Sequence, residues 1–104
     1  MSDAKQSALD LVKGHIKELN GLLAQTSQDL NFAAGKERVA KWKARTIPQL
    51  AQHLGATYAQ RFSDTDPGPS FTNDLLEEFS DEVEVYRTCL EEIAKEFAKK
   101  SETP

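Results

Sequence analysis

The segment LEEFSDEVEVYRTCLEEIAKEF, residues 76–97, decides the fold. Its apolar residues recur at alternating steps of three and four: Leu76, Phe79, Val83, Tyr86, Leu90, Ile93 and Phe97. This spacing places all seven on one side of an α-helix. Negative charge at Asp74 and positive charge at Lys99 suit the two ends of a helix dipole. We predict a helix over about residues 72–99, capped by Thr72, with a frayed tail over 100–104.

A second long helix is predicted near the start of the chain. The same spacing recurs in Leu9, Val12, Ile16, Leu19 and Leu23, which predicts a helix over about residues 3–24. Asn20-Gly21 is a stop signal, because glycine readily adopts the left-handed conformation of a C-terminal cap. The apolar stripe continues past it, so we favour continuation of the helix.

The middle of the chain is predicted to be helical but interrupted. Strong helix formers follow Lys36, with Val39 and Trp42 on one face. Pro48 costs about 3 kcal/mol inside a helix, so we predict a kink or break near Thr46 and Ile47. The resulting segments are 33–47 and part of 48–62, the latter interrupted at Gly55. Residues 63–71, rich in Asp, Pro and Gly, are predicted to form a loop.

These elements predict an all-α fold for a single domain over residues 1–104. No strand-like alternation, internal repeat or low-complexity tract is seen in the sequence. A length of 104 residues with 38% hydrophobic content suits one small core. We expect a small antiparallel bundle of three to four helices, with two long terminal helices and a kinked or broken middle segment.

Composition narrows the functional classes. The net charge of −4 argues against binding nucleic acid or an anionic membrane through the overall field. Cys89 is the single cysteine, which excludes an intramolecular disulfide and a cysteine metal cluster and favours a cytoplasmic location. We expect neither a signal peptide nor a membrane span.

No grouping of residues points to catalysis. His15 and His53 each stand alone, without a second histidine or a cysteine at metal-ligand spacing. Cys89 is interpreted as a structural thiol beside the apolar seam. We expect a non-enzymatic protein without a cofactor or bound metal.

Charge is distributed unevenly along the chain. Residues 36–61 carry six cations against one carboxylate (net +5), and residues 62–97 carry eleven carboxylates against two cations (net −9). Three interpretations remain open. The two faces compensate each other as surface pairs, or one of them docks an oppositely charged protein. Alternatively, the basic segment contacts a phosphate backbone through Arg38, Lys41, Lys43 and Arg45, with Trp42 stacking on a base.

Two features suggest self-association. Ser7, Gly14 and Gly21 recur at steps of seven on the side of the first helix away from its apolar stripe. The helix either tolerates these glycines or uses them for close approach by the middle helix or a second subunit. Phe97 extends the last seam beyond the reach of a first helix of about 22 residues, so its apolar end is available to a second copy. A homodimer is the preferred assembly.

The sequence therefore predicts a cytoplasmic protein–protein interaction or adaptor module, with self-association as a further expectation. Its partner is expected to be a protein. We do not expect it to contact nucleic acid or a membrane. The alternative is a nucleic-acid-associated regulator, antitoxin-like or phage-derived, that uses the basic middle helix.

The seam of the last helix has a direct test. Leu90→Asp places a charge in the centre of the predicted core, which we expect to unfold the domain because an unpaired buried charge is strongly disfavoured. Far-UV circular dichroism and thermal melting measure this. Unchanged helicity and melting temperature would contradict the seam.

Overall fold

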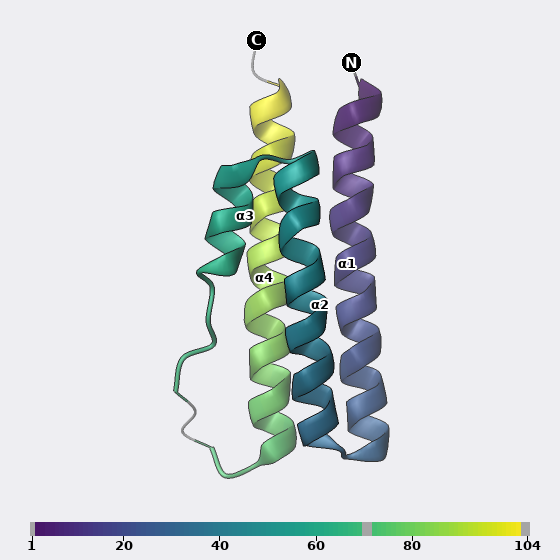
Figure 1. The fold of residues 1–104 in the computed structure, drawn as a ribbon, viewed down its shortest axis with the longest axis vertical. Helices are drawn as coiled ribbons and strands as arrows, with labels where there is room; N and C mark the ends of the chain where they lie inside the picture. Colours follow the sequence, from purple (N-terminus) through teal and green to yellow (C-terminus); the bar gives the residue numbers. More distant parts are fainter. Residues whose placement is uncertain (1, 70–71, 103–104) are drawn as a thin grey trace.

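Four helices make up the fold, as predicted for an all-α bundle. The computed structural model describes residues 2–69 and 72–102, and the side chains of 4–69 and 72–99. The helices are α1 (Ser2–Asp29), α2 (Phe32–His53), α3 (Ala56–Ser63) and α4 (Leu75–Glu102). Long helix α1 runs antiparallel to α2 and α4, and short α3 lies beside the upper parts of α2 and α4, on the side of the bundle away from α1 (Figure 1). No helix in the described part of the chain is both long and apolar enough to cross a membrane.

The core follows the seam of α4. Phe79, Val83, Leu90 and Ile93 are fully buried, whereas Leu76 and Phe97 at the seam's ends are only half-buried. On α1, the fully buried residues of the predicted stripe are Val12 and Leu19, with Leu9, Ile16 and Leu23 half-buried at its edges. Both predicted stripes therefore face the interior.

Trp42 of α2 lies at the centre of this core. Its ring packs edge-on against Phe62 of α3, with centroids 5.7 Å apart, and at a tilt against Tyr86 of α4 at 6.2 Å. The indole nitrogen donates a hydrogen bond of 3.1 Å to the carbonyl oxygen of His15 in α1. A buried indole N–H needs such a partner, so one side chain links α2 to the other three helices.

The first helix is longer than predicted. It runs through the exposed Gly21 to Asp29, because Thr26 continues the buried face one turn beyond Leu23. Leu30 then adopts a left-handed conformation, with φ of 56°, and ends the helix. Asn31 caps the next helix by accepting a hydrogen bond of 3.1 Å from the backbone N–H of Ala34.

Of the two outcomes predicted near Pro48, a kink or a break, the break is wrong. Helix α2 continues through Pro48 to His53. Because proline has no N–H, the carbonyl oxygen of Ala44, four residues before Pro48, lacks its usual helical hydrogen bond. Pro48 and Ala44 both lie on the exposed side of α2, where water can bind this oxygen. Thr46 and Leu50, both fully buried, hold the flanking turns in place. The predicted interruption at Gly55 is confirmed: α2 ends before it and the next helix starts at Ala56, and its φ of 121° disfavours any residue with a Cβ.

The last helix starts later than predicted and extends further. Thr72 is not its N-cap: the Asp74 carboxylate accepts from the backbone N–H groups of Leu76 and Glu77, at 2.9 and 3.2 Å. Helix α4 therefore begins at Leu75. Residues 100–102, predicted as a frayed tail, are helical, and 103–104 lie outside the described residues.

The close approach of helices occurs at Gly35, which the sequence analysis did not single out. A Cβ built there would lie 2.6 Å from Thr26 Oγ1, 2.8 Å from Thr26 Cγ2 and 3.2 Å from Phe79 Cε1. Gly35 and Thr26 are both buried. The absence of a side chain therefore lets α2 approach α1 and α4 closely beside the turn.

Two glycine substitutions test this arrangement. Gly35→Ala is expected to lower the free energy of unfolding by about 1–3 kcal/mol, because the added methyl group overpacks the contact. Gly14→Ala is the matched control: a Cβ there meets nothing within 4 Å, so we expect a gain of up to about 1 kcal/mol from helix propensity. Urea denaturation measures both changes. Equal stabilisation by the two substitutions would contradict close packing at Gly35.

Candidate functional site

The cations of the middle segment are distributed over several neighbours. Four lie within salt-bridge distance of carboxylates: Lys36 of Glu78 at 3.0 Å, Arg38 of Asp29 at 3.7 Å, Lys41 of Glu37 at 3.1 Å and Arg45 of Glu18 at 3.0 Å. All four cationic side chains are more than one-third exposed, so each pair is worth at most about 1 kcal/mol. Arg61 of α3 pairs with Glu92 and Glu96 of α4. The positive charge is therefore compensated by α1, by α2 itself and by α4.

Lys43 has a different environment from the other predicted contact residues. Its half-buried ammonium donates a hydrogen bond of 2.7 Å to the carbonyl oxygen of Thr65. The same nitrogen lies 4.7 Å from the centre of the Tyr86 ring and 5.8 Å from that of Phe62, where cation–π attraction is effective. Lys43 thus anchors the chain that follows α3. Sequence spacing contains no signal for this role, because the partners come from three other parts of the fold.

The residues predicted for self-association do not make the helix contact or the overhang that the sequence suggested. Gly14 and Gly21 are exposed, and a Cβ at either would meet nothing within 4 Å, so close approach by the middle helix is wrong. Phe97 packs edge-on against Tyr58 of α3, with ring centroids 6.0 Å apart. Helices α1 and α4 each contain 28 residues, so the expected overhang of α4 beyond a shorter first helix is wrong too.

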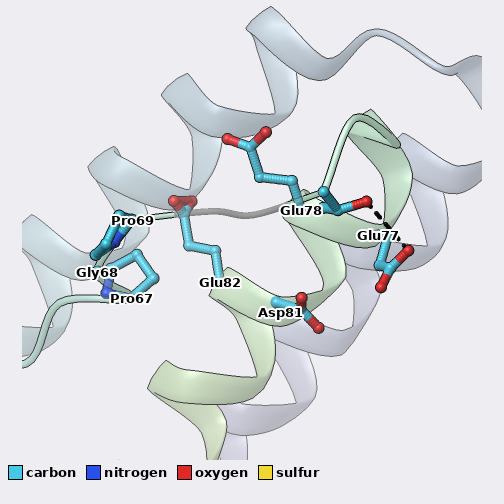
Figure 2. Close-up of a pocket in the computed structure, with 8 residues that line it drawn as sticks. Pro67, Gly68, Pro69, Glu77, Glu78, Asp81 and Glu82 are labelled. Carbon is cyan, nitrogen blue, oxygen red and sulfur yellow. Dashed lines mark hydrogen bonds between the residues drawn. The ribbon is translucent and has the colours of Figure 1, made fainter.

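A cleft of about 360 Å³ opens between the loop after α3 and the first turns of α4. We call it the acidic cleft, and it is lined by Pro67, Gly68, Pro69, Thr72, Glu77, Glu78, Asp81 and Glu82. Figure 2 shows the Glu82 side chain extending from α4 toward the Pro67–Pro69 turn. Glu77 is held on the other side of the helix by a hydrogen bond of 3.3 Å from the hydroxyl of Thr72. The sequence analysis placed these residues in a loop and an acidic helix but did not bring them together.

Glu82 is a half-buried carboxylate on the α4 side of the cleft. Burial raises the pKa of Glu82, and the neighbouring charge of Glu78 raises it further. Lys36 and Lys43 oppose this effect by favouring the charged form. Within the described residues, no lysine or arginine side chain lies within salt-bridge distance of Asp81 or Glu82. The cleft therefore gathers four carboxylates, of which Glu78 is paired with Lys36, whereas Asp81 and Glu82 are not paired with a lysine or arginine of the described chain.

The other reactive side chains occupy structural positions. Cys89 is 8% exposed and lies 3.3 Å from the hydroxyl oxygen of Thr65. His53 is exposed at the end of α2, and His15 is half-buried in the α1–α2 interface. Among residues 4–69 and 72–99, no three histidine, cysteine, aspartate or glutamate side chains are grouped so as to hold a metal ion.

Lys43 and Lys41 form a matched pair for testing the internal anchor. Lys43→Met removes a hydrogen bond and a cation–π contact, so we expect the free energy of unfolding to fall by roughly 1–2 kcal/mol. Lys41→Met removes only an exposed pair within α2, for which we expect a change below about 0.5 kcal/mol. Urea denaturation of the two variants gives the comparison. A larger effect at Lys41 than at Lys43 would contradict the assignment.

Comparison of the chain with protein-family models, with curated proteins and with solved structures found no match.

Proposed function

We propose that this chain is a non-enzymatic protein–protein interaction module of the cytoplasm, which binds a basic segment of its partner at the acidic cleft. The observation that carries the proposal is the contrast between the two charged regions. The cations of residues 36–61 are engaged within the fold, whereas Asp81 and Glu82 have no cation at salt-bridge distance among the described residues. Charge of this kind steers and selects an oppositely charged partner.

The chemistry of the cleft suits a lysine or arginine side chain. An incoming cation would stabilise the charged form of Glu82, whose burial raises its pKa. The rings of Pro67 and Pro69 line the same cleft and offer an apolar surface to the aliphatic stem of such a side chain. Recognition would therefore combine one partly desolvated ion pair with apolar contact, and it would weaken with rising salt.

The nucleic-acid alternative is less well supported. Phosphate contact by Arg38, Lys41 and Arg45 would compete with their present carboxylate partners, and the ammonium of Lys43 is occupied beneath the loop. Trp42 is fully buried, so it has no face on which a base can stack. Of the two sequence arguments for self-association, the overhang of α4 at Phe97 is lost, because Phe97 packs against Tyr58 and α1 is as long as α4. Contact of a second copy with the exposed Gly14 and Gly21 remains as an alternative.

The proposal is tested by titrating isotope-labelled protein with an arginine- and lysine-rich peptide at low salt and following backbone amide NMR signals. We expect perturbations to concentrate in residues 65–69 and 72–86. Asp81→Asn combined with Glu82→Gln should weaken binding by roughly five- to tenfold, because one partly desolvated ion pair is worth about 1 kcal/mol or more.

Glu91→Gln is the matched control, because it removes one carboxylate from an exposed position of α4 outside the cleft. This variant should bind the peptide within about twofold of wild type after correction for net charge. Equal weakening by Glu91→Gln, or no perturbation at low salt, would contradict the acidic cleft as the binding site. Tight binding of a DNA or RNA duplex through α2 would instead support the alternative.

A further inference from the structure

His15 occupies the interface between α1 and α2, away from the acidic cleft. Its side chain is 14% exposed, and Nδ1 lies 3.3 Å from the hydroxyl oxygen of Thr46 on α2. The hydroxyl of Thr46 donates its own proton to the carbonyl oxygen of Trp42, at 2.7 Å. The Thr46 oxygen must therefore accept from His15, which assigns the proton of the neutral ring to Nδ1.

The second ring nitrogen of His15, Nε2, makes no hydrogen bond to the described chain when the ring is neutral. Nε2 is buried and has no hydrogen-bond partner among the described residues. In the neutral ring it is an acceptor, which costs little when left unpaired in comparison with a charged donor. Protonation would turn Nε2 into a cationic donor in the same place, where nothing accepts the hydrogen bond.

The surrounding charges do not reverse this penalty. Burial lowers the pKa of His15, Glu18 on α1 raises it in part, and Arg45 on α2 lowers it again. Glu18 lies 4.0 Å from Nδ1 but 3.0 Å from the guanidinium of Arg45, so its carboxylate is already shared. The backbone carbonyl oxygen of His15 also accepts the hydrogen bond from the Trp42 indole. Protonation of the His15 ring therefore disturbs the same residue that joins α1 to the core.

We propose that His15 is a proton-sensitive contact that loosens α1 from α2 when the solution is acidified. Because its pKa is lower in the folded protein than the usual 6.5, the unfolded or opened chain binds more protons. Stability from this group is complete above about pH 6.5 and is lost as pH falls from there through the lower, folded-state pKa. The contribution of Glu82 to stability changes with pH in the opposite direction, because its raised pKa makes acidification favour the folded state.

The test compares wild type with His15→Asn and His53→Asn between pH 7.5 and 5. Asparagine places an amide nitrogen near the position of Nδ1 but cannot become charged, and His53 is the exposed matched control. In wild type we expect acidification to shift the emission of Trp42, the single tryptophan, to longer wavelength and to lower the hydrogen-exchange protection of α1 on the order of tenfold. His53→Asn should keep both changes, and His15→Asn should lose them.

A second measurement needs no variant that could fail to fold. The ring signals of His15 in wild type are followed by NMR over the same pH range, and the pKa of His15 is expected to lie below the usual histidine value of 6.5. A His15 pKa at or above 6.5 would overturn the proposal. Retention of the wild-type pH response by folded His15→Asn would overturn it as well.

Discussion

The hydrogen bond from the Trp42 indole to the carbonyl oxygen of His15 is the constraint on which the rest of the arrangement depends. The indole can be fully buried only because its N–H finds an acceptor, and that acceptor belongs to a different helix. Fixing the ring in this orientation directs its faces and edges toward Phe62 and Tyr86. The positions of α1, α3 and α4 around α2 thus follow from the requirements of a single large side chain.

The orientation of Trp42 also determines the direction in which the neighbouring basic side chains of α2 point. Successive residues of a helix are turned by about 100° relative to each other, so neighbours in sequence face different surroundings. Lys41 points to solvent and pairs within α2, Lys43 turns beneath the loop, and Arg45 reaches α1. The run of positive charge in the sequence is therefore divided among salt bridges with several helices and an internal contact, whereas Asp81 and Glu82 of α4 are not paired with a lysine or arginine of the described chain.

The parts of this fold that the sequence predicts are those set by local periodicity. The stripes of α1 and α4, the helical middle segment and its interruption at Gly55 all follow from spacing and residue type. The sequence left a kink or a break at Pro48 open, because the cost of the proline depends on whether the carbonyl oxygen four residues earlier reaches water, and that depends on how the helix packs. The acidic cleft and the roles of Lys43 and Gly35 depend on pairing between distant segments, and no pattern along one sequence contains that information.

The first turn of α1 and the last turn of α4 lie at the same end of the bundle, and the first turn of α4 lies at the other end (Figure 1). A short linker between these two ends would close the chain into a ring, which could be reopened within the loop between α3 and α4. The circularly permuted chain would then run α4, α1, α2, α3, and the pair of helices most distant in sequence would become a local hairpin. Because contacts between sequence neighbours form faster than distant ones, the permuted chain would reach the same bundle by a shorter search.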